Sequence, residues 1–206
     1  MAVLSRACVV IILSVVFSPS ISAAQGIEGG LHGGVTFSNL PNLRNAIDFG
    51  GPVDLKHRTG VVVGPFVAFP INQTVAFQVE ALYAMKGATP TDGTNELQLR
   101  LGYLDFPLLL RVATPATQRF FFLAGPSFNV NVSATAIDVI PSRTKENVSD
   151  RIHDAELGLV LGGGAAFGAF LVEGRYSAGL TNIADDPQLT ASLKNRAFAI
   201  LVGARF

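Results

Sequence analysis

The chain has 206 residues, with 15 basic (Lys and Arg) and 15 acidic (Asp and Glu) residues, so its formal net charge is zero. This balance excludes the basic excess by which nucleic-acid-binding proteins attract phosphate backbones. Hydrophobic residues make up 49% of the chain, yet no apolar run after the N-terminus reaches the roughly 18 residues that a membrane helix needs. The apolar residues are spread over short segments and, with 21 Gly and 15 Phe, favour β structure.

The N-terminal segment Met1–Ala24 has the three parts of a secretory signal peptide. Arg6 supplies a positive charge, Ala7–Phe17 forms an apolar core, and Ser22–Ala24 provides small residues at the cleavage positions. The apolar core is too short for a membrane-spanning helix, which argues against an uncleaved anchor. We therefore expect export from the cytoplasm and one mature domain at residues 25–206.

Eight segments of the mature chain alternate between apolar and small or polar residues with the period of two that is typical of β-strands. In the third segment, for example, Val79 falls on one face while Gln78 and Glu80 fall on the other. In chain order the eight segments are Ile27–Phe37, Gly60–Pro70, Val75–Ala84, Leu97–Arg111, Phe120–Val132, Ala155–Gly162, Phe170–Tyr176 and Arg196–Phe206.

The fourth segment changes phase near its middle. In its first half the odd-numbered residues, including Leu99 and Leu101, are apolar, and we expect them to face outward with Arg100 inward. From Leu104 onward the even-numbered residues form the apolar row instead. One extra residue in a strand ladder produces such a shift, and a proline cannot donate to the ladder, so we predict a β-bulge at Asp105–Pro107.

The connections between these segments alternate between long and short. The long ones are Ser38–Thr59, Gly87–Asn95, Ala134–His153 and Gly179–Asn195, and the short ones are Ile71–Thr74, Thr114–Gln118 and a turn around Gly168. Bacterial outer-membrane barrels have an even number of strands, short periplasmic turns and longer extracellular loops. The pattern therefore predicts an all-β, eight-stranded antiparallel up-and-down transmembrane β-barrel with both termini in the periplasm. A soluble lipocalin-like barrel or a sandwich is the alternative.

The last segment has a continuous apolar face that ends on the C-terminal residue itself, formed by Phe198, Ile200, Val202 and Phe206. In an outer-membrane barrel, lipid covers such a face and the first strand pairs with the edge of the last. A terminal Phe on the closing strand resembles the sorting signature of bacterial outer-membrane barrels. This resemblance implies that the barrel assembly machinery recognises the C-terminal strand.

Charged residues of both signs fall on the faces opposite the apolar rows: Glu28, Glu80, Arg100, Asp105, Arg111, Glu156, Glu173, Arg175 and Arg205. Eight strands leave an interior just wide enough for side chains to fill it. Buried charges must pair, because an unpaired one is costly. We therefore interpret Glu80, Arg100, Glu173 and Arg175 as a network of ion pairs that plugs the lumen. The functional alternative is a path for protons or ions.

The sequence offers little for catalysis or cofactor binding. Of the three histidines, His32 is expected to face the lumen near Glu28, and no two histidines have the spacing of a metal site. No serine lies near a histidine in a recognisable hydrolase motif. The single cysteine, Cys8, lies in the signal peptide, so the mature chain has no thiolate ligand and no disulfide. We expect no catalytic residue, no cofactor and no metal.

Several pieces of the chain, in their order and spacing, resemble the outer-membrane β-barrel domain of PorT-like proteins. They are Gly30–Leu40, Val79–Gly87, Tyr103–Arg111, Ala124–Phe128, Glu173–Ile183 and Lys194–Phe198. The resemblance implies an eight-stranded barrel in the bacterial outer membrane and carries no catalytic residue.

The expected function is a structural or binding role in the cell envelope rather than catalysis. Outer-membrane lipid is the expected surrounding, and the long loops are the expected contact with an envelope protein or a ligand. A narrow ion-conducting pore and a soluble lipocalin-like carrier of an apolar ligand are the alternatives. The carrier would have an apolar interior and a polar exterior, the reverse of the faces assigned above.

Overall fold

The structure is a computed structural model that describes residues 26–41, 43, 54–92, 95–114, 119–140, 144–147, 154–183 and 193–206. The predicted signal peptide Met1–Ala24 lies outside these residues. Ten strands form one antiparallel sheet: β1 (Glu28–Asn39), β2 (Asp54–Pro70), β3 (Val75–Glu80), β4 (Leu82–Thr91), β5 (Glu96–Ala113), β6 (Phe120–Ile140), β7 (Thr144–Asn147), β8 (Ala155–Phe167), β9 (Phe170–Gly179) and β10 (Arg196–Arg205). No helix in these ranges is long and apolar enough to cross a membrane.

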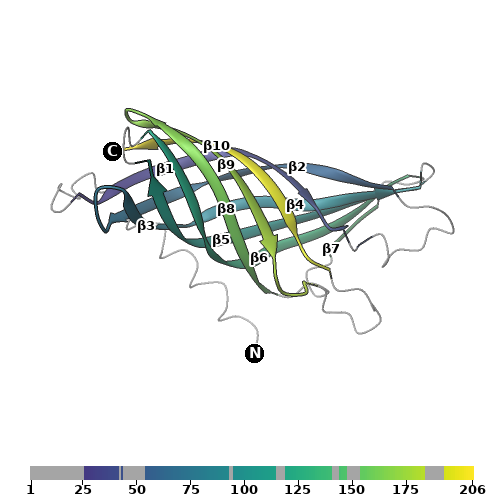
Figure 1. Ribbon diagram of the computed structural model, residues 1–206. Coiled ribbons are helices and arrows are strands. Elements are labelled where there is room, and N and C mark those ends of the chain that lie inside the picture. The colour runs from purple at the N-terminus through teal and green to yellow at the C-terminus, as the bar shows by residue number, and fades with distance from the viewer. Residues whose placement is uncertain are drawn as a thin grey trace, which may run out of the picture.

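The sheet closes into a ring of eight strands (Figure 1). β3 and β4 are two parts of one strand interrupted at Ala81, since both lie between β2 and β5. β1 closes the ring against β10, in register from Gly30 opposite Arg205 to Asn39 opposite Arg196. β7 is an additional short strand that pairs with the end of β6. The predicted eight-stranded antiparallel barrel, closed by its first and last strands, is confirmed.

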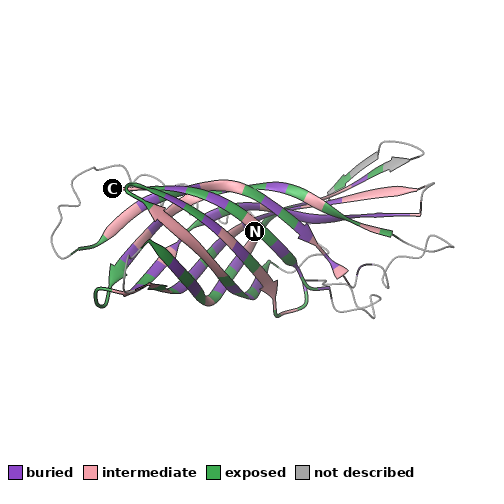
Figure 2. Cartoon of the chain, turned by 45° about the horizontal axis from the view of Figure 1, so that its top comes forward, coloured by how far each residue is buried: buried purple, intermediate pink, exposed green. Residues whose placement is uncertain are grey.

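The outer wall of the barrel is apolar. Along most strands, buried and exposed residues alternate (Figure 2). The aliphatic side chains on the outer face are between 39% and 55% exposed: Leu31, Val35, Val61, Val63, Leu108, Leu110, Leu157, Leu159, Leu161, Val172, Ile200 and Val202. A belt of this kind is stable in lipid but not in water. It is the reverse of the polar exterior expected of a soluble carrier.

Two rows of aromatic side chains border this belt. Near the short turns, here called the turn end, they are Phe69, Phe77, Phe120, Phe122, Phe167, Phe170 and Phe206; toward the other end, the loop end, they are Phe37, Tyr83, Phe106, Phe128, Tyr176 and Phe198. On β10, Phe198 and Phe206 lie about 27 Å apart along the strand, or about 20 Å along the axis at the usual tilt of about 40°. This is close to the apolar band of about 25 Å in outer-membrane barrels, which aromatic residues border on both sides.

At the loop end, β2, β4, β5 and β6 continue past the ends of β1, β8, β9 and β10 (Figure 1). Together with β7 they form a sheet that we call the extension. Within its described residues 54–60, 85–91, 96–103 and 133–138, no large apolar side chain is exposed. The extension therefore projects beyond the apolar belt.

The extension corrects three predicted loops. The connection Ser38–Thr59 was expected to be long, but β2 already begins at Asp54. Gly87–Asn95 was expected to be a long connection, but β4 runs to Thr91 and β5 begins at Glu96. Within Ala134–His153, β6 continues to Ile140 and β7 follows. Outside the lipid a strand has no need for one apolar face, so the alternation that reveals membrane strands is lost there. The predicted turn at Ile71–Thr74 and the one around Gly168, which has a φ of +62°, lie where they were expected.

The predicted phase change in β5 is wrong. Leu99 and Leu101, expected to face outward, are 8% and 2% exposed and line the interior, in one unbroken row with Asp105 and Leu109. Residues 105–107 pair regularly with β6, so the bulge predicted there is absent. The register instead shifts between residues 102 and 103, leaving Val132 of β6 as the extra residue.

Candidate functional site

The centre of the lumen holds a buried cluster of charged side chains from two strands, β3 and β9. Arg175 on β9 donates to Glu80 on β3 through both terminal nitrogens, with Nη1 to Oε2 at 2.5 Å and Nη2 to Oε1 at 2.8 Å. The Nε atom of Arg175 donates to Oε2 of Glu173 at 2.7 Å, and Nη2 also contacts that oxygen. These are charge-assisted hydrogen bonds that fix the planar guanidinium in one orientation.

His32 on β1 lies between the two carboxylates of this cluster. Its Nε2 is 3.3 Å from Oε1 of Glu173, and its Nδ1 is 3.9 Å from Oε1 of Glu80. The imidazole stacks on the Phe66 ring, with centroids 4.3 Å apart. His32 therefore faces the lumen, as expected, but contacts Glu80 and Glu173 instead of Glu28.

A second charged group lies at the turn end of the lumen. Arg111 on β5 donates through Nη2 to Oε2 of Glu28 at 2.6 Å, and Arg205 on β10 donates through Nη1 to Oε1 at 3.2 Å. Nη1 of Arg111 also reaches Oε1 of Gln78 at 3.3 Å. Since Gln78 donates to Glu80, a chain of hydrogen bonds connects the turn end to the central cluster.

A third polar group lies toward the loop end. Lys86 on β4 pairs with Asp105 on β5 at 2.8 Å, and its ammonium lies 4.8 Å from the centre of the Tyr103 ring. Asn195, which precedes β10, donates through Nδ2 to Oε2 of Glu156 at 2.9 Å and to the Tyr103 hydroxyl at 3.1 Å. Asn195 thus connects the end of the last loop to β5 and β8.

Apolar side chains fill the lumen between these polar groups, apart from the hydrogen-bonded side chain of Gln78. Between the turn-end group and the central cluster, one layer is formed by Phe66, Leu109, Phe121, Leu123, Val160 and Leu171. The spaces among the described lumen residues include one of about 40 Å³ beside Lys86, Glu156 and Arg175, and one of about 90 Å³ at the turn end beside Glu28 and Arg111. Each has room for only a few waters.

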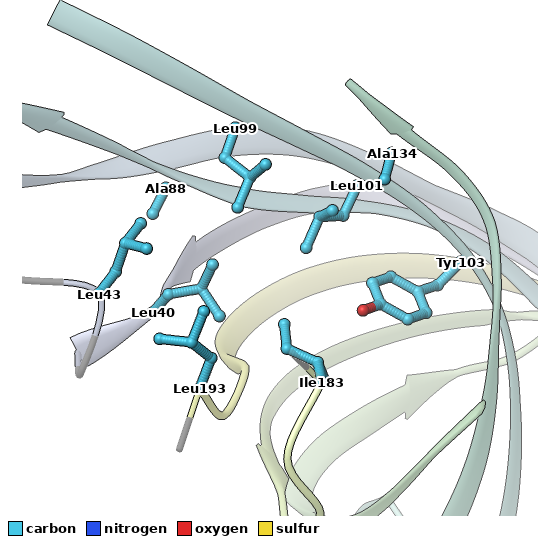
Figure 3. Close-up of a cluster of buried hydrophobic side chains, with 9 residues drawn as sticks. All are labelled: Leu40, Leu43, Ala88, Leu99, Leu101, Tyr103, Ala134, Ile183 and Leu193. Carbon is cyan, nitrogen blue, oxygen red and sulfur yellow. The ribbon is translucent and has the colours of Figure 1, made fainter. Parts of the chain in front are cut away.

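An apolar plug covers the lumen at the loop end (Figure 3). Leu40 and Leu43 follow β1, while Ile183 and Leu193 belong to the connection between β9 and β10. The backbone of that connection is held by a hydrogen bond of 2.9 Å from Ile183 N to Leu193 O. These four side chains pack against a wall formed by Ala88, Leu99, Leu101, Tyr103 and Ala134.

The structure brings together most of the predicted lumen charges, but in three separate groups. Glu80, Glu173 and Arg175 form the central cluster; Glu28, Arg111 and Arg205 lie at the turn end; Asp105 and Glu156 lie toward the loop end. Arg100 belongs to none of them, which corrects its placement in the plugging network. Because Leu99 and Leu101 face inward, Arg100 faces outward, where its Nη2 donates to Oε1 of Gln98 at 3.0 Å.

The sequence interpretation missed Lys86, Tyr103 and Asn195 as lumen residues. Lys86 lies two residues beyond Ala84 on the inward face, just past the predicted strand segment Val75–Ala84. Tyr103 was placed outward by the mistaken phase of β5. Asn195 was counted as the last residue of a loop. Only Lys86 had a local signal, because its parity places it on the inward row of β4.

The histidines and acidic residues within the described ranges form no cluster of three or more that would suit a metal ion. His57 lies in the extension, and His153 lies outside the described residues.

In the extension, hydrogen bonds from Gln98 and Lys56 lower the pKa of the Glu96 carboxyl. The charged side chains of the lumen pair with one another or form hydrogen bonds with Gln78 and Asn195. Each of them therefore holds a neighbouring side chain in place.

Substituting Asn195 by Ala should destabilise the folded barrel by about 2 kcal/mol, because the buried Glu156 carboxyl loses its amide donor. The midpoint of urea unfolding, followed by the electrophoretic mobility of folded and unfolded chains, measures this change. Lys194 is exposed beside it and provides the control. Lys194→Ala should stay within about 0.5 kcal/mol of wild type, and equal effects of both substitutions would contradict the role of Asn195.

Comparison with solved structures gives barrels from outer membranes. Neisserial surface protein A has a TM-score of 0.52 at 12% identity, with 86% of this chain and 97% of that chain covered. Ail of Yersinia pestis has a TM-score of 0.48 at 13% identity, with 87% and 98% covered. OprG from Pseudomonas aeruginosa has a TM-score of 0.47 at 13% identity, with 87% and 95% covered. At 12% identity, the likeness to Neisserial surface protein A, whose TM-score is above 0.5, bears on the fold alone.

Comparison with curated proteins gives no match. The family described as "Outer membrane protein beta-barrel domain" matches residues 22–185, well over half of the chain. The closed ring of strands, its apolar outer wall and this match agree with one another. The chain therefore belongs to the outer membrane protein beta-barrel domain family.

Proposed function

We propose that this outer membrane protein is a closed, non-conducting barrel that presents a binding surface to the cell exterior at its loop end. The observation that carries the proposal is the structure of the loop end, where strands extend beyond the apolar belt and enclose an apolar plug. Strands β2, β4, β5 and β6 continue beyond the apolar belt, and Leu40, Leu43, Ile183 and Leu193 pack inside them as a plug. Protein surface that projects this far beyond the lipid is available to a ligand or an envelope partner.

A non-catalytic role is supported by the pairing of the lumen charges and by the small volume of the spaces beside them. The guanidinium of Arg175 is engaged by two carboxylates, and the spaces of about 40 and 90 Å³ are too small for a substrate. The filled lumen also disfavours the narrow pore, since ions would have to pass the apolar layer around Leu109 and Leu171 as well as the plug.

The proposal also includes the export of the chain and its assembly in the outer membrane. The segment Met1–Ala24 would direct the chain out of the cytoplasm, and the barrel assembly machinery would recognise β10 and its terminal Phe206. Support comes from the position of β10 at the closing seam and from the 86% exposure of Phe206 at the turn end. The resemblance to PorT-like proteins would place the chain in one branch of the family.

Planar lipid bilayers provide the first test. Purified protein that migrates as the folded form should insert without producing stepwise conductance, because apolar layers block the lumen. A porin added to the same bilayer afterwards serves as the positive control. Reproducible conductance steps that change in Glu80→Gln or Arg175→Gln variants would contradict the closed barrel.

Complementation tests the role of the loop end. In a strain lacking the protein, a chain in which a short Gly-Ser turn replaces residues 141–153 should still fold but fail to restore the envelope phenotype. A chain with the periplasmic turn Ile71–Thr74 replaced by Gly-Ser is the matched control and should restore it. Full restoration by the loop-shortened chain would assign the function to the barrel wall instead.

A further inference from the structure

Two arginines of the extension lie close together without a carboxylate partner among the described residues. Arg58 is on β2 and Arg100 is on β5, and both are partly exposed. The hydrogen bond of Arg100 goes to the neutral amide oxygen of Gln98, at 3.0 Å. The Nε atoms of both arginines are shielded from solvent and donate to no described group.

Gly87 on β4 brings the two side chains together. It is paired directly with Arg100, so a side chain at position 87 would lie on the same outer face. A Cβ on Gly87 would lie 2.0 Å from the carbonyl oxygen of Leu99 and 2.9 Å from Cδ of Arg58, so the Arg58 side chain passes directly beside this glycine. The φ of +141° at this residue also favours glycine. Arg58 therefore crosses β4 on the outer face toward Arg100.

The Glu96 carboxylate, four residues before Arg100 on β5, already has two donors. Glu96 accepts from Lys56 at 3.3 Å and from Gln98 at 3.3 Å. Burial and the nearby Arg100 guanidinium lower the pKa of Arg58. Two positive charges that are close together and partly removed from water repel each other. An anion bound between the two guanidinium groups would offset this repulsion.

The pair lies just beyond the loop-end aromatic row. The Tyr83 hydroxyl lies over Gly102, 3.2 Å from where a Cβ would be, and Val132 borders the same position. Arg100 shares the outer face with Gly102 and is two residues, or about 7 Å, nearer the loop end. Tyrosine at this level marks the boundary between the hydrocarbon and the headgroups, so the arginines lie at headgroup height.

We propose that Arg58 and Arg100 bind a phosphate group carried by the headgroup of a lipid in the surrounding leaflet. The planar guanidinium donates two parallel hydrogen bonds to phosphate oxygens and suits this role better than an ammonium group does. The lipid chains would then lie along the apolar wall below Tyr83. The site lies on the outer face of the extension where it leaves the apolar belt, so it does not depend on what the end of the extension binds.

Native mass spectrometry of the detergent-solubilised, folded protein tests the site, with lipid A as the probe. Wild type should bind lipid A at least tenfold more tightly than the Arg58→Gln, Arg100→Gln double variant. Dephosphorylated lipid A should bind wild type as weakly as lipid A binds the double variant. Lys56→Gln removes a neighbouring cation that is already paired with Glu96, and should change the affinity less than twofold.

The variants are first checked for the mobility of the folded form. Should the double Gln variant not fold, the Arg58→Lys, Arg100→Lys variant replaces it, with an expected loss of threefold to tenfold because an ammonium binds phosphate as a point charge. Equal binding by wild type and both double variants, or an equal loss in Lys56→Gln, would overturn the site. Displacement of lipid A by equimolar inorganic phosphate would overturn the lipid as its ligand, in favour of a soluble phosphate compound.

Discussion

Arg175→Met is expected to destabilise the barrel by about 3–5 kcal/mol, the usual cost of removing one partner from a buried ion pair. Glu80 and Glu173 are 2% and 1% exposed, and Arg175 is the guanidinium that both contact. Without it, two carboxylates remain in the lumen beside only His32 and the amide of Gln78. Urea unfolding of the protein in lipid vesicles, followed by electrophoretic mobility, measures the loss.

Two further variants separate lost charge from lost volume. Arg196→Met changes an exposed arginine on β10 and should stay within about 0.5 kcal/mol of wild type. The triple variant Glu80→Gln, Glu173→Gln, Arg175→Met should recover much of the stability, because no buried ion is left unpaired. A loss below about 1 kcal/mol in Arg175→Met would show that the central cluster contributes little to stability.

Gly34→Val should prevent closure of the ring. A Cβ on Gly34 would lie 2.0 Å from the carbonyl oxygen of Ile200 and 2.8 Å from the Cα of Leu201. Both atoms belong to the backbone of β10, which cannot rotate away as a side chain can, so we expect a cost of about 3 kcal/mol or more. The measurement is the fraction of protein that refolds in detergent to the faster-migrating form.

The neighbouring glycine is a matched control. A Cβ on Gly33 would meet no atom within 4 Å. Gly33→Val therefore adds an apolar side chain beside the outer apolar wall and should refold like wild type. Equal refolding of the two variants would contradict the tight approach of β1 and β10 at this position.

The fold was predictable because a lipid-facing wall requires one apolar side on every strand. Phe198, Ile200 and Val202 follow that rule and lie outside, as predicted. Leu99 and Leu101 do not, because beside the plug the inner face of β5 is apolar while the polar Gln98 and Arg100 face outward. Alternation shows which residues share a face, but in a part of the strand beyond the lipid the apolar face is the inner one.

The sequence by itself determined the number of membrane strands, their antiparallel order and the closing seam, since each depends on a local period of two or on the length of a connection. Tertiary structure alone decided which charges meet. Glu80 and Arg175 are 95 residues apart, and only the stagger of the strands around the closed ring places them at one height. The same stagger brings Arg58 over Gly87 toward Arg100, whereas no sequence spacing relates these three positions.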